Sequence, residues 1–171
     1  MDFNKFDARA AAETGAAMQI VDPYTSEPIT DGDNPCRVLV RGIASPSLQK
    51  AQREKAKAAA AKAKKAADDA SDDARVMEDV HNEMIEAAIP FVAGFENVSR
   101  GDQPLTAKAD DVRWFLNLSF PSIGAKLDSD GNPVLDDDGS PQFESKNKTF
   151  AAQVIEFAGE QENFTGKPKK G

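Results

Sequence analysis

The chain has 171 residues, a formal net charge of -8, and 21 basic against 29 acidic side chains. This length fits one domain, or one domain with an extended appendage. Large apolar residues are scarce, because alanine supplies 27 of the residues counted as hydrophobic, while Leu, Ile, Val and Phe together number 34. We therefore expect a small compact core.

The sequence excludes several classes of protein. It has no apolar run close to the roughly 18 to 20 residues of a membrane span, and its first residues lack the pattern of a signal peptide. We expect a soluble, intracellular protein with no membrane partner. One cysteine, Cys36, and one histidine, His81, cannot form an internal disulfide or a Cys/His zinc site. We interpret Cys36 as a small buried hydrophobe and His81 as a surface residue.

Residues 1–45 have the pattern of a small β-containing region. A short Ala-rich helix is expected over residues 6–14, because Gly15 closes it. The segments 17–22 and 36–42 then predict two paired strands, since apolar and polar residues alternate in the second of them. The loop between them is rich in proline, which removes backbone donors.

Residues 46–89 predict one long helix. There is no Gly or Pro between Ser47 and Ala88, and the first half of this segment carries +6 while the second carries -7. Residues 51–74 offer only alanine as apolar side chains, so we expect a weakly docked stalk there. From Val76 onwards, apolar residues recur at spacings of three and four and predict a face that docks on a core. Pro90 ends or kinks the helix.

Residues 90–171 predict a C-terminal helical region. One helix follows Thr106, interpreted as its cap, and a last helix begins at Asn147 or Lys148. A tandem acidic repeat over 127–143 predicts a hairpin or loop insertion, and residues 165–171 predict a mobile tail. The expected fold class is α+β and predominantly α: a small N-terminal β-hairpin or sheet, one long charged helix, and a helical subdomain with an acidic hairpin insertion.

The sequence disfavours three kinds of site: an EF-hand calcium loop, a nucleic-acid interface and a catalytic centre. Asp128, Asp130 and Asn132 match the start of an EF-hand loop, but its later positions hold Pro133 and Gly139, where Gly and Glu are needed. The lysine-rich helix has no interleaved aromatic residues, which disfavours nucleic acid. No motif of a nucleophile, phosphate loop or metalloprotease is present, so the sequence predicts a protein that is not an enzyme and binds no cofactor or metal.

Three segments together resemble the tail assembly chaperones of long-tailed bacteriophages. The first is DPYTSEPI at 22–29 with the strand RVLVRGIAS, the second joins IPFVAGFENV to the helix TAKADDVRWFLNL, and the third ends in ENF at 162–164. The resemblance implies a non-catalytic protein of the host cytoplasm that coats the tape measure protein and helps tail tube subunits polymerise around it. The acidic insertion and the stalk-like helix depart from the family pattern.

Partner binding is predicted in the C-terminal region, where the large aromatic side chains concentrate. A groove that accepts a helix would suit a tape measure segment. Some of these side chains must also form the core. The predicted partner-binding residues are Phe91, Phe95, Trp114, Phe115, Phe150, Phe157 and Phe164.

The sequence leaves two alternative functions open. The protein is alternatively a minor structural component of the phage particle that uses the long helix as a spacer or bundle element. A calcium-binding or glycan-acting module is a third reading, which rests only on the acidic loop. Pairing of the basic and acidic halves of the long helix between copies would also give a homo-oligomer.

Overall fold

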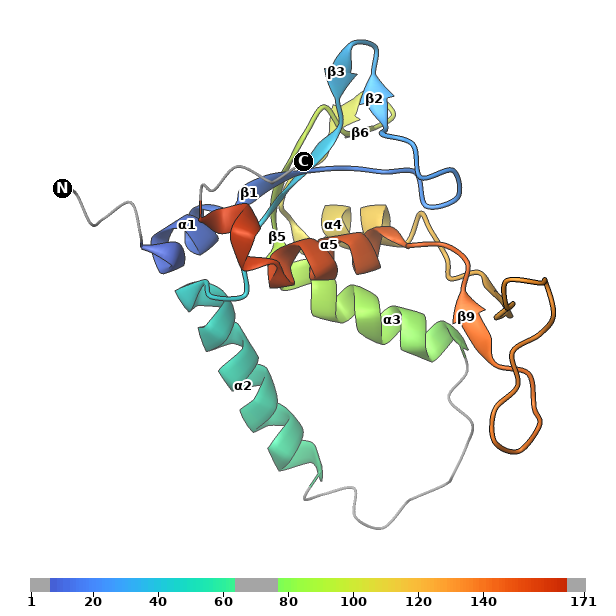
Figure 1. Cartoon of the computed structure of the whole chain (residues 1–171). Helices are drawn as coiled ribbons and strands as arrows, with labels where there is room; N and C mark the ends of the chain where they lie inside the picture. Colours follow the sequence, from blue (N-terminus) through green and yellow to red (C-terminus); the bar gives the residue numbers. More distant parts are fainter. Residues whose placement is uncertain (1–6, 64–76, 166–171) are drawn as a thin grey trace.

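The computed structural model describes residues 7–63 and 77–165 (Figure 1). Within these residues there are five α-helices and four small antiparallel sheets. The helices are α1 (Ala8–Thr14), α2 (Pro46–Ala63), α3 (Met77–Ala88), α4 (Ala109–Leu116) and α5 (Phe150–Gly159), with 3-10 turns η2 (Ile89–Phe91) and η3 (Gln161–Phe164). The strands are β1 (Ala16–Gln19), β2 (Thr30–Asp31), β3 (Asn34–Pro35), β4 (Arg37–Val40), β5 (Val92–Glu96), β6 (Ser99–Arg100), β7 (Gln103–Pro104), β8 (Ile123–Ala125) and β9 (Phe143–Ser145).

The central sheet has three strands in the order β1-β4-β5. Strands β1 and β4 are antiparallel, with Met18 opposite Val38, which confirms the predicted pairing of segments 17–22 and 36–42. Val38 and Val40 are completely buried, whereas Arg37 and Leu39 are only partly covered, as the alternation along β4 predicts. The first helix, α1, also lies where the sequence places it.

The third strand, β5, comes from the segment that follows α3. Phe95 in β5 lies opposite Val38 in β4, so the N-terminal strands and residues beyond position 90 form one sheet. The local sequence favours an extended chain here, because Pro90 stops the preceding helix and Gly94 follows within the strand.

The expected fold class, α+β and predominantly α, is wrong. The structure is mixed α/β, 38% helical and 24% strand, and much of the strand content lies in ribbons of two or three residues. Such strands are too short for a period of two to be recognised in the sequence. Several are held by tight turns instead: Gly32 between β2 and β3, and Gly101 between β6 and β7, both have positive φ.

The single long helix is also wrong. Its ends form two helices, α2 and α3, whose apolar residues Ala51 and Ala87 line the same groove. One straight helix would hold these residues about 55 Å apart, since each residue adds about 1.5 Å. Strong helix formers without Gly or Pro specify helix locally, but they do not encode a reversal of the chain. The central part of the predicted stalk, 64–76, and the end of the predicted tail, 166–171, lie outside the described residues.

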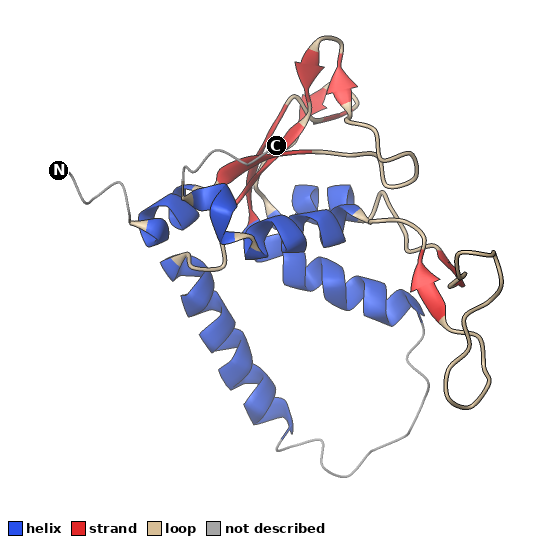
Figure 2. Ribbon diagram, viewed as in Figure 1, coloured by secondary structure: helices blue, strands red, loops and turns tan. Residues whose placement is uncertain are grey.

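The core lies between the central sheet and three mutually packed helices, α3, α4 and α5, while α2 extends away from them (Figure 2). Phe115 links the layers, because its ring lies 5.2 Å from that of Phe95 in β5 and 4.7 Å from that of Phe150 in α5. Val112, Leu116 and Val154 fill the space around them without exposed surface. Val112 and Leu116 are four residues apart and therefore share the buried face of α4, whereas Leu118, beyond the end of the helix, is exposed.

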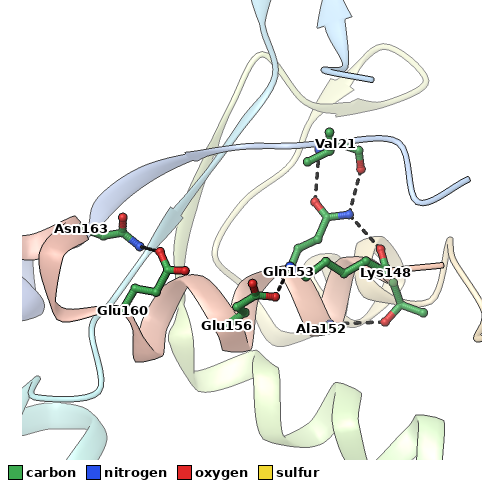
Figure 3. A network of polar contacts seen from close by, with 8 residues as sticks. Val21, Lys148, Ala152, Gln153, Glu156, Glu160 and Asn163 are labelled. Carbon is green, nitrogen blue, oxygen red and sulfur yellow. Dashed lines mark hydrogen bonds and ion pairs between the residues drawn. The ribbon is translucent and has the colours of Figure 1, made fainter. Parts of the chain in front are cut away.

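Helix α5 is fixed to the sheet by a buried glutamine (Figure 3). The side chain of Gln153 accepts a hydrogen bond from the backbone N–H of Val21 and donates one to the Val21 carbonyl, at 3.2 and 2.9 Å. It also donates to the carbonyl of Lys148, just before the helix. Thr149 caps the helix by accepting from the N–H of Ala152, so α5 begins within two residues of its predicted start.

The acidic repeat folds as an insertion bounded by the β8–β9 ribbon. Backbone hydrogen bonds of 2.8 Å join three residues in a ring, because Val134 donates to Lys126, Gln142 donates to Val134, and Lys126 donates to Gln142. These residues are eight positions apart, which is the repeat length. Asp128 and Asp136 each accept two backbone N–H groups from their own turn. The acidic side chains of the repeat thus stabilise two equivalent turns.

Candidate functional site

A groove lies between the first turns of α2 and the side of α3 that faces them. Its volume is about 690 Å³. The two helices diverge here: α2 extends away from the core from its first turn, whereas α3 stays packed against α5 (Figure 1). The groove is lined by Leu48, Ala51 and Gln52 from α2, by Asp79, Asn82, Glu83, Glu86 and Ala87 from α3, and by Pro90 and Phe91 from η2.

The floor of the groove is apolar and fixed. Leu48 and Phe91 are 2% and 7% exposed, and both belong to the main core. Pro90 sits in the first positions of η2, where its missing N–H ends the α-helical hydrogen bonding of α3. A partner side chain that enters the groove would therefore meet a preformed apolar surface.

A polar cluster sets the position of α2. The N–H of Leu48 bonds to the hydroxyl of Ser45, at 3.4 Å, and Pro46 occupies the first helical position, which is the usual beginning of a helix. Glu13 of α1 accepts hydrogen bonds from the Ser45 hydroxyl and the Ser47 N–H, at 2.5 and 3.1 Å. These bonds, chiefly the one from Ser45, lower the pKa of Glu13 to about 2.

The α3 wall of the groove is acidic. It presents Asp79, Glu83 and Glu86, and α3 contains no Lys or Arg. Among the described side chains of α2, Ala51 and Gln52 line the facing wall. Glu86 accepts a hydrogen bond from Arg113 of α4 at 2.8 Å, and this bond holds the pKa of Arg113 above its ordinary value. The groove therefore combines an apolar floor with one acidic wall.

The interpretation of His81 as a surface residue is wrong. His81 is only 2% exposed, and its ring lies 4.9 Å from that of Phe120, edge to face. Neither ring nitrogen has a hydrogen-bond partner, and burial lowers the pKa of His81. The helical spacing contains the signal that was missed, because His81 precedes the buried residues Ile85 and Ala88 by four and seven positions.

The structure places the predicted partner-binding residues mainly in the core. Phe115, Phe150 and Phe164 are buried, and Phe95, Trp114 and Phe157 are partly buried against the same core. Of the seven, only Phe91 lines the groove. Their role in partner binding remains a prediction.

Trp114 and Phe157 show how the remaining aromatic side chains are placed. The guanidinium of Arg100 lies 4.9 Å from the Trp114 ring centre, so the indole is covered by a cation on one side. The ring of Phe157 meets that of Phe164 edge to face. Phe164 in turn lies against Gly42, where an added Cβ would be 2.9 Å from a ring carbon.

Sequence reasoning missed a second group of exposed apolar side chains. They lie after α4 and on the β8–β9 ribbon: Leu118, Phe120, Ile123 and Phe143 are between 46% and 68% exposed. Phe143 pairs with Ala125, and Ala125 lies two residues from Ile123 on β8. Ile123 and Phe143 therefore lie on the same face of the ribbon. The short strands around Pro121 carry no clear periodic pattern, so this face could not be found from the sequence.

No group of three or more His, Cys, Asp or Glu side chains within 7–63 and 77–165 is arranged to hold a metal ion. Cys36 is buried and donates to the carbonyl of Asn97, and burial raises the pKa of its thiol, which makes it a poor nucleophile. None of the helices in these two ranges has the length and apolar character needed to cross a bilayer.

Comparison with known proteins gives no relative: the chain matches no family model, no curated protein and no solved structure.

Proposed function

We propose that the protein is a non-catalytic phage tail assembly chaperone that binds helical segments of the tape measure protein in the groove between α2 and α3. It acts in the host cytoplasm, keeps the tape measure protein soluble and assists the assembly of tail tube subunits around it. It works without a cofactor.

The groove is the observation that carries this proposal. Two helices diverge from an apolar floor formed by Leu48, Pro90 and Phe91, and such a space suits the apolar face of an amphipathic helix. The long, partly apolar helices of a tape measure protein offer many such faces.

The placement of the three resembling segments gives further support. The segment RVLVRG contains β4 and the following Arg41 and Gly42, IPFVAGFENV contains β5, and ENF ends η3. Strand β4 pairs with β5, and Phe164 packs against Gly42. Segments that resemble one family in sequence thus meet in one packed unit, as expected if they belong to one fold.

Co-expression with the tape measure protein tests the proposal. Ala87→Trp fills the groove from an exposed position on α3, and Ala109→Trp places the same side chain at the exposed start of α4. We expect the wild-type chain and Ala109→Trp to keep the tape measure protein soluble and to co-purify with it. Ala87→Trp should lose both properties while its circular dichroism spectrum is unchanged. If Ala87→Trp binds like the wild type, the groove is not the binding site.

The alternative is a minor structural protein of the phage particle. The extended α2 favours it, because a helix whose described side chains are mostly exposed can serve as a spacer or a bundle element. Purified particles separate the two proposals. A chaperone should be absent from finished particles, and a structural protein should be present in them in a fixed copy number.

A further inference from the structure

We propose that the acidic insertion is a second docking surface, which binds a segment of another protein whose exposed apolar side chains are bordered by Lys or Arg. The residues that form this surface are not those that line the groove between α2 and α3. The inference therefore goes beyond the proposed function and does not depend on it.

Three backbone hydrogen bonds close a ring in the insertion. Lys126, Val134 and Gln142 each donate to one other member and accept from the third, at 2.8 Å in every case. Because the bonds run in one direction around the ring and successive members are eight residues apart, the ring has approximate threefold symmetry. Three antiparallel arms meet there: two are the turns of the repeat, and the third is the β8–β9 ribbon.

Each arm places a large apolar side chain next to the ring. The residue that follows each ring member faces a proline or an alanine across its arm, and the three pairs are Leu127 with Pro133, Leu135 with Pro141, and Phe143 with Ala125. Symmetry-related residues lie on the same side of a ring, and successive residues of an extended chain point to opposite sides. Leu127, Leu135 and Phe143 therefore project from one side and form an apolar platform, in which they are 51%, 54% and 68% exposed.

The platform is exposed but held in place. Six of the nine exposed large apolar side chains among the described residues lie between Leu118 and Phe143. Folded monomers rarely gather such side chains on one surface unless it binds something. The β8–β9 arm is fixed to the segment after α4, because Asn147 accepts a hydrogen bond from the Ser122 N–H and donates one to the Phe120 carbonyl, at 2.7 and 2.9 Å. A partner would therefore meet a surface that is already formed.

The charge around the platform indicates which partner it takes. From Lys126 to Glu144 the chain has six acidic side chains and one basic side chain. The carboxylates of Asp130, Asp137 and Asp138, in the end turns of two arms, are exposed and have no bonding partner in the described part of the chain. Basic side chains around an apolar patch of a partner would meet these free acceptors. A second copy of this chain would bring acidic turns against acidic turns and be repelled, so the occupant is another protein.

Synthetic peptides serve as probes for the full chain. The first carries leucines flanked by lysines, the second the same leucines flanked by glutamates, and the third alanines flanked by lysines. Fluorescence anisotropy measures their binding at low and high salt. The leucine–lysine peptide should bind at least about tenfold more tightly than either control, and its advantage over the glutamate peptide should shrink as salt screens the charges. Equal binding of the lysine and glutamate peptides would overturn the proposal.

Apolar variants locate the site. Leu127→Ser combined with Leu135→Ser should weaken binding of the leucine–lysine peptide at least about fivefold. The matched control, Tyr24→Ser combined with Ile43→Ser, removes apolar side chains that are 65% and 51% exposed elsewhere and should leave binding unchanged. All four side chains are exposed, so the circular dichroism spectrum should not change. Equal loss in the two double variants would overturn the platform as the site.

Charge variants test the acidic turns beside the platform. Asp130→Asn combined with Asp137→Asn should weaken binding of the same peptide about threefold to tenfold. The matched control, Glu27→Gln combined with Asp33→Asn, removes the same charge from exposed positions elsewhere and should leave binding unchanged. If both pairs lose binding equally, net charge is responsible and the selection of a basic partner is overturned.

The remaining outcomes separate this inference from the proposed function. Ala87→Trp, which fills the groove, should leave peptide binding unchanged. If it abolishes binding, the peptide occupies the groove, and the platform is overturned while the proposed function stands. Absence of binding by all three peptides would also overturn the platform and leave the groove to its co-expression test. Sedimentation of the chain alone tests a second copy: a dimer that Leu127→Ser with Leu135→Ser converts to a monomer would overturn the inference, because the occupant would then be this chain itself.

Discussion

Helices α5 and α2 show two opposite ways in which this chain uses helix. In α5, ten residues place Phe150, Ala151, Gln153, Val154 and Ala158 in the core, and the helix contacts the sheet, α3 and α4. In α2, Leu48 is the one buried side chain among those described, and the following residues are exposed. Helix propensity does not explain the docking, because α2 is rich in strong helix formers while α5 contains the weaker formers Val, Ile and Phe. The difference lies in the large apolar side chains, which decide whether a helix joins the core.

The comparison also explains where the candidate site lies. A helix that is held only at its first turn leaves its inner side uncovered, and α3 has a docked face and an exposed face beside it. The groove therefore forms where a docked element and a projecting element meet. The proposed binding site therefore lies at the boundary of the core rather than at its centre.

The largest difference in stability is expected between two Gln→Ala substitutions, one in α5 and one in α2. Gln153→Ala removes two hydrogen bonds to the backbone of Val21 and leaves a buried donor and acceptor without partners. We expect the free energy of unfolding to fall by about 2–4 kcal/mol. Gln52→Ala, at an exposed position of α2 on the wall of the groove, should change it by less than about 0.5 kcal/mol. Urea unfolding measures both values, and equal effects would remove the distinction between a docked and a projecting helix.

A second contrast concerns two glycines, Gly42, which is closely packed, and Gly159, which is not. A Cβ at Gly42 would lie 2.9 Å from both the Ala12 Cβ and the Phe164 ring, whereas a Cβ at Gly159 would meet nothing within 4 Å. Gly42→Ala should therefore destabilise the protein by about 1–3 kcal/mol. Gly159→Ala should be neutral or stabilising by up to about 1 kcal/mol, because alanine favours helix. Thermal unfolding of the two variants measures both effects. If Gly42→Ala leaves the unfolding temperature unchanged, Phe164 is not packed against Gly42 as described.

The burial of His81 on the docked face of α3 predicts that the stability of the protein depends on pH. Burial lowers the pKa of His81, so the unfolded chain binds a proton more readily than the folded one. The stability that neutral His81 contributes is complete above its ordinary pKa of about 6.5 and is lost as pH falls below that value. His81→Leu should raise stability by about 1 kcal/mol and reduce the loss between pH 7.5 and about 5.5. Asn82→Leu, one residue along and exposed, should leave this dependence as in the wild type. An unchanged profile for His81→Leu would assign the dependence to other groups.

The smallest effect concerns the attachment of α2. The pKa of Glu13 is about 2, below its ordinary value of 4.5, so its bonds to Ser45 and Ser47 contribute stability above pH 4.5 that is lost as pH falls towards 2. Glu13→Gln should lower the unfolding temperature slightly at pH 7, and the difference from the wild type should shrink below pH 4.5. A difference that stays constant down to pH 3 would show that the carboxylate charge does not hold α2.

Much of the docked region could be predicted from the sequence. The strand pairing of β1 with β4 and the positions of α1 and α5 follow from alternation, helical periodicity and caps. The reversal between α2 and α3 could not be predicted, because residues such as Ala51 and Glu83 read as one uninterrupted helix. The burial of His81 has a signal in the helical spacing, because Ile85 and Ala88 follow it by four and seven positions, but its polar neighbours Asp79 and Glu83 favour an exposed position. The groove could not be predicted, because its two walls come from a segment that looks like one helix.

Hydrogen exchange on the purified complex with the tape measure protein tests the central claim most directly. If the groove holds the partner helix, exchange should slow in residues 46–54 and 77–91 on binding, and the amides of α4 and α5 should keep the protection they have in the free chain. Slower exchange confined to α4, α5 or the β8–β9 ribbon, with 46–54 and 77–91 unchanged, would contradict the account and place the partner elsewhere.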